Sequence, residues 1–400
     1  MRSERTIVGL VGAVQFVNIV DFMMVMPMGP DFARGLGVDM DKIGIVAGAY
    51  TLAAAVTGLV LSPILDRFDR RLALAVCMGG LALGTVAGGF AVGLGSLVAA
   101  RVVAGAFGGP ATSVAMSIVA DAVPPERRGR AMGAVMGAFS VASVLGVPAG
   151  LWLSDAAGWR APFFVLAAVG AMIATAAIAL LPPLRGHLAA EVERPRLRLL
   201  LVRAVVWLSL SATALVTLSA FTIIPNLSAF IQFNMGWPRE GLPYLYMVGG
   251  GLSFLALRLF GAVADRLGAV PVFFGGTAAL IVVGVAWFGV VPAAAPVWLC
   301  FPATMVAMSA RNVAYQALLS RVAAPSERAA FQSLNSAVQH AGSSVAAFLG
   351  SLVLGVSGSG ALVGMPALGL WALCFAIPVP FLLAEVGRRL AAGGADRVAP

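Results

Sequence analysis

The chain has 400 residues, of which 60% are hydrophobic and only 11% are charged, and its formal net charge is +9. A soluble fold cannot cover this much apolar surface with so few polar side chains, so the composition excludes a soluble protein and indicates that a lipid bilayer surrounds the chain. At about 20 residues for each crossing, there is room for about a dozen transmembrane helices and for no sizeable soluble domain.

Twelve apolar runs follow one another along the chain, separated by charged or Gly/Pro-rich breaks, and each is long enough to cross the membrane as a helix. They are residues 6–28, 42–64, 72–94, 96–120, 131–154, 160–182, 204–230, 243–264, 269–291, 295–318, 329–355 and 361–385. The first run is too long for a signal peptide and lacks a small-residue cleavage site, so we interpret it as a retained helix. The prediction is an all-α integral membrane protein with twelve transmembrane helices.

The positive charges predict the orientation of these helices. If the N-terminus is cytoplasmic, most of the 26 Arg and Lys residues fall in cytoplasmic loops, and only Arg34, Lys42, Arg160 and Arg239 fall outside. Positive residues in short loops resist translocation, so we expect both termini in the cytoplasm. The positive net charge then reflects the membrane topology of the chain. It favours anionic lipid headgroups as partners and argues against nucleic acid.

Two loop motifs recur about 200 residues apart. Asp66-Arg67 after the second run returns as Asp265-Arg266 after the eighth, and Pro125-Glu126-Arg127 returns as Ser326-Glu327-Arg328. Between the two sets lies the longest polar segment, residues 184–203, with five arginines. We therefore predict a six-helix bundle over 1–183, a cytoplasmic linker over 184–203, and a second six-helix bundle with a short cytoplasmic tail over 204–400, both bundles sharing one orientation as a pseudo-twofold parallel repeat.

These motifs resemble the loop signature Gly-x-x-x-Asp-Arg-x-Gly-Arg-[Lys/Arg] of the major facilitator superfamily. The first copy has Ser62 and Asp69 in place of glycines, and the second keeps Gly261 and Gly268 but lacks the trailing arginines. The resemblance covers essentially the whole chain, and it implies a secondary transporter that works by alternating access.

Two further segments are similar to the same family. Arg101-Val-Val-Ala-Gly105 looks like its Arg-x-x-x-Gly signature at the start of the fourth span. Gly146-Val-Pro-Ala-Gly150 resembles the fifth-helix region of the drug and sugar efflux branch, which includes arabinose-efflux-type permeases and drug:proton antiporters. In the antiporter version Gly and Pro are adjacent, whereas Val147 stands between them here.

Asp21 is a carboxylate inside the first apolar run, and such a residue marks a functional site by default because an ionised group in the membrane is costly. An apolar setting favours the protonated form of a carboxylate, as a proton carrier requires. Asp21 and Arg101 lie at about the same depth, roughly 8 to 10 Å below the outer surface at 1.5 Å per residue. We predict that they form the proton-coupling pair; a permanent ion pair that only fixes packing is the alternative.

The family resemblance implies that spans one, four, seven and ten line a central cavity. Gln15, Asn18 and Asp21 follow at three-residue steps and share one face of the first helix. The alternative for this stripe is a hydrogen-bonded seam against a neighbouring helix, and Arg311 is either a substrate contact or a structural anchor. The predicted cavity residues are Gln15, Asn18, Tyr50, Asn226, Arg311, Asn312 and Gln339.

A cytoplasmic gate is implied by the same resemblance, in which Asp66, Arg70 and Asp121 form a network. The alternative is that the arginines serve only as topology anchors. A structural pair between Arg258 and Asp265 is also expected. The full set of predicted gate residues is Asp66, Arg67, Arg70, Arg71, Asp121, Asp265 and Arg266.

Enzymatic and cofactor chemistry find no support in the sequence. Lys42 is the only lysine and lies in a predicted outer loop, so there is no phosphate-binding loop for ATP and no Schiff-base lysine in the membrane. His187 and His340 are far apart and form no metal-binding pattern. We predict no enzyme activity, no cofactor and no metal.

The most favoured function is therefore proton-coupled export of a small organic solute such as a drug, sugar or secondary metabolite. Uptake by a proton symporter or a uniporter is the main alternative, and a non-transporting membrane sensor is a further one. The expected partners are a small-molecule substrate, protons and membrane lipid. The Arg-, Ala- and Gly-rich composition is typical of GC-rich bacterial genomes, so we expect a bacterial inner membrane as the location. A monomer is the expected oligomeric state.

Overall fold

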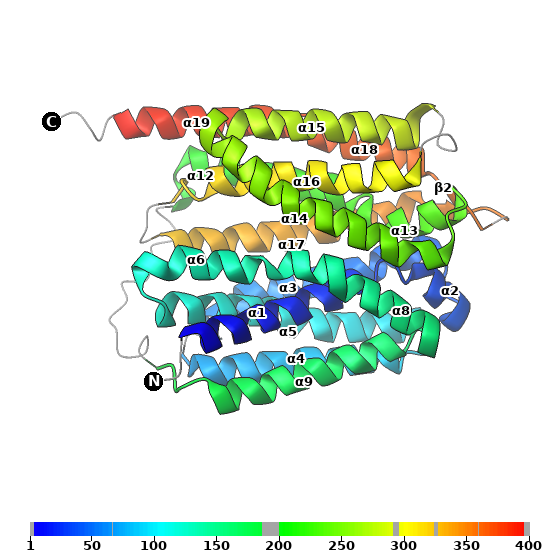
Figure 1. The fold of residues 1–400 in the computed structure, drawn as a ribbon, viewed down its shortest axis with the longest axis horizontal. Helices are drawn as coiled ribbons and strands as arrows, with labels where there is room; N and C mark the ends of the chain where they lie inside the picture. Colours follow the sequence, from blue (N-terminus) through cyan, green and yellow to red (C-terminus); the bar gives the residue numbers. More distant parts are fainter. Residues whose placement is uncertain are drawn as a thin grey trace. The chain divides into compact units, whose positions relative to one another are not determined.

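The computed structural model describes residues 4–65, 67–185, 200–290, 296–323, 327–358 and 360–395. The chain divides into two compact units, residues 1–193 (unit 1) and 194–400 (unit 2). Helices account for nearly all described residues of both units. Each unit is a bundle of long helices (Figure 1).

The predicted all-α membrane fold is confirmed. Ten helical stretches of the described residues are long and apolar enough to cross a membrane. Two more helices, α16 (Val297–Leu319) and α17 (Arg328–Val353), have the length of a span and carry more polar side chains, which include Arg311 and Asn335. Helices thus occupy all twelve predicted runs.

Unit 1 is built around its longest helix, α5, which packs against α3, α4 and α1 (Figure 1). α9 covers α4, and α1 also contacts the α6 to α8 segment. The elements are α1 (Glu4–Met24), α2 (Gly29–Leu36), the 3-10 turn η1 (Met40–Lys42), α3 (Ile43–Leu65), α4 (Arg70–Gly89), α5 (Leu94–Ala122), α6 (Pro125–Met136), α7 (Ala138–Val141), the π-helical turn η2 (Ala142–Gly146), α8 (Val147–Ala157) and α9 (Ala161–Leu180).

In unit 2, α16 packs against α14 and α15, while α12 packs against α17, α18 and α19. The elements are α12 (Ala204–Phe221), α13 (Ile224–Phe233), η3 (Arg239–Gly241), α14 (Leu242–Leu267), α15 (Ala269–Val285), the π-helical turn η4 (Ala286–Val290), α16, α17, β1 (Gly355–Val356), β2 (Leu362–Val363), α18 (Met365–Ala376) and α19 (Val379–Ala395). β1 and β2 pair antiparallel as a short hairpin.

Several predicted spans are interrupted, which the apolar pattern did not show. The fifth passes through η2 just before Pro148, and the seventh breaks at residues 222–223 before Pro225. Proline removes a backbone donor and clashes with the preceding turn, so a helix commonly kinks or restarts there. The helix α2 and the β1–β2 hairpin were also not predicted.

Glycines of α5 allow α3 to approach it closely. A Cβ atom at Gly105 would lie 2.1 Å from the carbonyl oxygen of Tyr50, and one at Gly109 would lie 2.7 Å from that of Ala54. Small residues at such contacts let two backbones meet, which favours helix association in lipid. This contact sets Tyr50 directly against the polar residues of α5.

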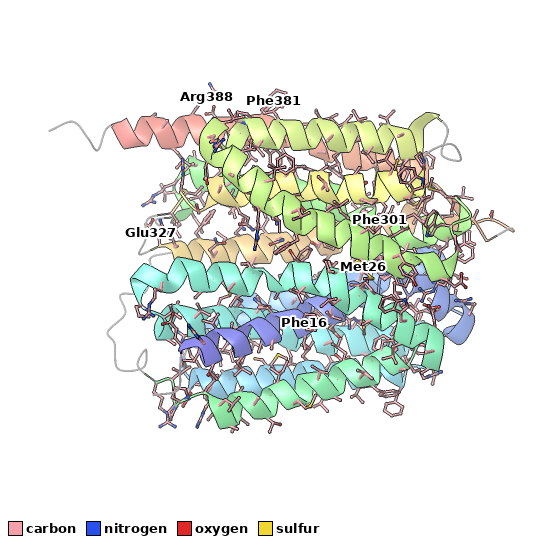
Figure 2. All side chains as sticks on the ribbon, viewed as in Figure 1. Phe16, Met26, Phe301, Glu327, Phe381 and Arg388 are labelled. Atoms are coloured by element: carbon pink, nitrogen blue, oxygen red, sulfur yellow. The ribbon has the colours of Figure 1, made fainter. Side chains whose placement is uncertain are left out.

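Large apolar side chains stay exposed along the spans of both units, for example Leu83 at 70% and Leu352 at 81%. On α19, Phe381 and Arg388 both project outward (Figure 2). Such exposed hydrophobic residues on a soluble surface would favour aggregation, whereas a bilayer solvates them.

Candidate functional site

A buried ion pair lies in the interior of unit 1. The Arg101 guanidinium donates to the Asp21 carboxylate at 2.8 Å, and the exposed fractions of the two side chains are 1% and 0%. Arg101 also donates to the backbone carbonyl of Asp21 at 3.0 Å, and the Thr85 hydroxyl donates to the other carboxylate oxygen at 2.7 Å. The structure thus brings α1, α4 and α5 together around one carboxylate.

Tyr50 of α3 completes the surroundings of the pair. Its ring lies under the Arg101 guanidinium, 4.5 Å from ring centroid to Cζ. The close α3–α5 approach at Gly105 puts the ring there. A cation over an aromatic face in a desolvated site gains on the order of 2 kcal/mol, so the guanidinium is held from two sides.

The polar stripe of α1 continues this network toward the N-terminal end of the helix. The Tyr50 hydroxyl donates to Asn18 at 2.6 Å, and Asn18 donates to the Gly108 carbonyl at 2.6 Å and to Thr112 at 2.7 Å. Thr112 in turn donates to Gln15 at 3.2 Å. These contacts are those of an interhelical seam within unit 1, and a cavity-lining role for Gln15, Asn18 and Tyr50 stays a prediction.

Sequence reasoning missed Thr85 and Thr112. Threonine is common in apolar helices, where its hydroxyl usually bonds to the carbonyl four residues earlier. Only the packing of α4 and α5 against α1 distinguishes these two threonines from the others.

In unit 2 the candidate residues are dispersed. Asn226 is buried on α13, and Arg311 is buried on α16 with its guanidinium 5.1 Å from the centroid of the Phe273 ring, while Asn312 and Gln339 are exposed. No hydrogen bond or ion pair in the described part of unit 2 joins these four residues. Their role as cavity residues stays a prediction.

A different polar cluster in unit 2 was not predicted as a unit. Thr213 of α12 donates to Asn335 of α17 at 2.5 Å, and Tyr315 of α16 donates to the same Asn335 oxygen at 3.2 Å. The Thr213 and Tyr315 hydroxyls also contact each other. All three side chains are buried, so the cluster ties three helices together.

Part of the predicted gate lies in the described structure. Arg70 and Asp121 form an ion pair at 2.5 Å between the start of α4 and the end of α5. Arg67, Asp265 and Arg266 are exposed, and Arg71 is half-buried. Asp66 lies outside the described residues, so its place in the gate stays a prediction.

The expected pair between Arg258 and Asp265 is wrong. Arg258 instead stacks on the ring of Phe254, 4.6 Å from Cζ to the ring centroid, and no ion pair joins it to Asp265 in the described part of α14. The two residues are seven apart, about two turns, whereas Phe254 is one turn away and within reach of the arginine side chain.

Asp69, which departs from the family signature, has a clear structural role. Its buried carboxylate caps α4 by accepting from the backbone N–H of Arg71 at 2.9 Å. It also accepts from the backbone N–H of Leu184 at 3.1 Å and from the Arg185 side chain at 3.2 Å. Burial acts to raise the pKa of Asp69, but the Leu184 and Arg71 amides and Arg185 outweigh it, and the pKa falls below the usual value.

Replacing Asp69 with alanine is expected to destabilise unit 1 by about 1–2 kcal/mol near neutral pH, because a cap and two further hydrogen bonds to the carboxylate are lost. A carboxyl whose pKa is lowered by folding stabilises the fold above its unfolded pKa of about 3.9. This stabilisation is lost as the pH falls through the folded pKa. Thermal unfolding of the purified protein from pH 7 to pH 3 should show the gap between wild type and Asp69→Ala narrowing below about pH 4. A gap independent of pH would contradict this role.

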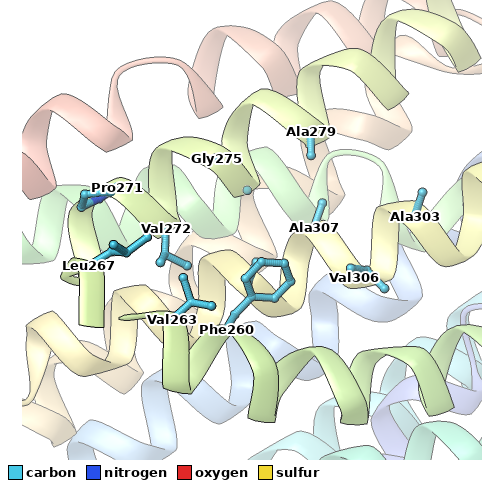
Figure 3. A pocket seen from close by; sticks show the side chains of 12 residues that line it. Phe260, Val263, Leu267, Pro271, Val272, Gly275, Ala279, Ala303, Val306 and Ala307 are labelled. Atoms are coloured by element: carbon cyan, nitrogen blue, oxygen red, sulfur yellow. The ribbon is translucent and has the colours of Figure 1, made fainter. Parts of the chain in front are cut away.

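A groove of about 500 Å³ lies between α14, α15 and α16 of unit 2. Its lining is apolar and includes Phe260, Val272, Gly275, Ala303 and Ala307 (Figure 3). A site for a polar substrate needs a few placed polar groups, and the groove lining offers none. Among all described residues, no group of three His, Cys, Asp or Glu side chains could hold a metal ion.

Comparison with known proteins gives consistent matches. The model of the family described as "Major Facilitator Superfamily" matches residues 11–347. The chain is 28% identical over 293 residues to "Inner membrane transport protein YdhP" of Escherichia coli (strain K12), covering 66% of this chain and 74% of that protein. It is 29% identical over 255 residues to "Chloramphenicol resistance protein" of Streptomyces lividans, covering 61% of this chain and 62% of that protein.

Solved structures of transporters have the same fold. A bacterial homolog of the human lysosomal transporter Spinster, inward-facing and occupied, matches with a TM-score of 0.72 at 18% identity, covering 95% of this chain and 96% of that one. A D-xylose-proton symporter matches with a TM-score of 0.74 at 13% identity, covering 94% and 96%. The matched family and these structures are transporters, which confirms the prediction that the chain is not an enzyme.

Proposed function

Because the chain belongs to the Major Facilitator Superfamily, we propose that it exports a small organic molecule in exchange for protons, with Asp21 and Arg101 as the proton-responsive pair. The single observation that carries this proposal is the buried ion pair between these two residues at 2.8 Å. An ionised pair inside a membrane helix bundle is expensive to desolvate, and a function is the usual reason to keep it.

Protonation of Asp21 changes what holds Arg101. The neutral carboxyl no longer offers the guanidinium a negative charge, while the guanidinium keeps its hydrogen bond to the Asp21 carbonyl and its contact with the Tyr50 ring. A buried cation without its counter-ion is unfavourable, so the protonated protein favours a conformation in which Arg101 finds water or an acceptor on the substrate. A proton thereby biases a two-state equilibrium through differential stability.

The Tyr50–Asn18 hydrogen bond links this event to the rest of α1. Arg101 stacks on the Tyr50 ring, and the hydroxyl of that ring is bonded to Asn18, which is bonded to α5 at two positions. The network therefore couples the protonation of Asp21 to the packing of α1 against α3 and α5.

Export is favoured over uptake by the relatives. One is named for chloramphenicol resistance, and a transporter that protects a cell from an antibiotic moves it outward.

The remaining features of the proposal are a monomer in a bacterial plasma membrane, with both termini in the cytoplasm as the positive charges favour, and a cytoplasmic gate that includes Arg70 and Asp121.

Inverted membrane vesicles provide the test of direction and coupling. Respiration acidifies the interior of such vesicles. Chloramphenicol or ethidium is then added as the candidate substrate, and a fluorescent pH probe follows the proton gradient. Export by antiport predicts that the added substrate accumulates in the vesicles and that protons leave them. Loss of accumulated substrate on energisation would indicate uptake instead, and accumulation unaffected by a protonophore would contradict proton coupling.

A further inference from the structure

Arg311 is a buried cation in unit 2 that no described acid neutralises. Its side chain is 4% exposed, and its Nε and Nη2 atoms have no hydrogen-bond partner among the described residues. Of the acids described in this unit, Glu327 and Glu385 pair with other arginines. Glu240 in η3 and Asp265 at the end of α14 make no ion pair with Arg311 in the described structure. A buried guanidinium in this state is strongly unfavourable unless an anion or other acceptor meets it.

The two unpaired atoms form one edge of the guanidinium. Nε and Nη2 carry parallel N–H groups, and this edge is the fork with which arginine binds an acceptor through two hydrogen bonds. Both donors of this fork therefore lack partners. The edge is free to bind one acceptor through two hydrogen bonds.

The facing helix α15 supplies the walls of this site. The guanidinium lies over the ring of Phe273, and Arg311 Cγ lies 2.9 Å from where a Cβ atom at Gly276 would be. Thr277 is one helical turn after Phe273 and so shares its face of α15. Thr277 is 2% exposed as a residue, and its buried hydroxyl also lacks a partner among the described residues.

Unit 1 contains a similar set of side chains with its anion built in, although there the ring is on α3 and the threonine on α4. There an arginine, Arg101, lies over an aromatic ring, and the Asp21 carboxylate accepts from that arginine and from the Thr85 hydroxyl. Unit 2 has the arginine, the aromatic ring and a threonine hydroxyl, but none of its described acids forms an ion pair with that arginine.

We propose that Arg311 and Thr277 bind one small monovalent anion, with chloride as the ion, in the place that a carboxylate takes in unit 1. One negative charge neutralises the guanidinium, and every unpaired polar atom at the site carries a donor hydrogen that an anion accepts. α15 and α16 approach each other closely here, since a Cβ atom at Gly276 would also lie 3.2 Å from the Ala307 carbonyl oxygen, and so close an approach favours a small ion. This site lies within unit 2, and it does not depend on the proposed transport function.

Equilibrium binding of radioactive chloride to the full-length protein in nanodiscs tests the proposal, without substrate and without a gradient. The wild type is expected to bind chloride saturably, with competition by bromide and none by benzoate, which is too large. Arg311→Gln should abolish binding, and Thr277→Val should weaken it about tenfold, since a hydrogen bond to a charged group is lost. Arg258→Gln is the matched control, because Arg258 also stacks on a phenylalanine but is exposed, and it should bind as the wild type does.

Three results would overturn the proposal. They are the absence of saturable chloride binding by the wild type, unchanged binding by Arg311→Gln, and competition by benzoate equal to that by bromide, which would indicate a carboxylate site for a larger organic anion. If Arg311→Gln does not fold, Thr277→Val decides, since it is nearly isosteric and an unchanged affinity in that variant also contradicts the assignment.

Discussion

Asp21→Asn is expected to destabilise unit 1 by about 3–5 kcal/mol, the cost of breaking a buried ion pair by removing one partner. The substitution leaves the Arg101 guanidinium buried and charged, because arginine cannot be deprotonated in a protein. Arg101→Met should cost less, since the Asp21 carboxyl that remains can shed its charge by taking up a proton. Unfolding of the purified variants by SDS, followed by tryptophan fluorescence, measures both values.

The double variant Asp21→Asn, Arg101→Met is the control for this experiment. Replacing both members removes the unpaired charge, so the double variant should recover most of the lost stability. Because the site is almost fully buried, the coupling between the two substitutions should exceed the range of about 0–1 kcal/mol found for exposed pairs. Additive effects of the two single substitutions would show that the residues do not act as an ion pair.

The same double variant is expected to lose proton-driven transport completely. It keeps the fold but contains neither the carboxylate that takes up the proton nor the guanidinium that responds to it. In proteoliposomes with an imposed pH gradient, chloramphenicol or ethidium transport should fall to the level of protein-free liposomes, and substrate-induced proton flux should disappear. Using the stable double variant separates loss of coupling from loss of folding.

Asp39→Asn serves as the matched control for transport. Asp39 precedes η1, is exposed and makes no side-chain cap hydrogen bond, so its replacement should leave both flux and coupling unchanged. Intact proton-coupled transport by the double variant would refute the role of Asp21 and Arg101. Proton coupling would then require another acid, and the exposed Asp155 near the end of α8 would be the next residue to test.

The helices could be predicted from the sequence because hydrophobicity is a local property of each run. Twenty apolar residues in a row need a bilayer, and no distant contact changes that requirement. The interruptions at η2 and at residues 222–223 were harder to predict, since a proline in a membrane helix is tolerated wherever neighbouring groups satisfy the freed carbonyl. The effect of Pro148 and Pro225 therefore depended on packing.

The candidate site was likewise predictable from the sequence only in part. A lone aspartate in the first run and an arginine at equal depth in the fourth predicted a pair before any contact was known. Depth is read from residue counts, but the partners Thr85 and Tyr50 depend on which face of α4 and α3 turns toward α1. Those faces are set by close packing against α5, at Gly105 for α3 and at Gly84 for α4. Arg258 was assigned the wrong partner for a local reason, because Asp265 is about two turns away on the same helix whereas Phe254 is one turn away.

By itself, the sequence determined the membrane environment, the number of spans, the repeat of the two halves and the unusual buried Asp21, because each follows from local composition or from spacing along the chain. Only the tertiary structure decided that Asp21 is neutralised within unit 1 while Arg311 meets no acid among the described residues of unit 2. The balance of charge in an apolar interior depends on contacts of a few ångströms between helices that are far apart in sequence.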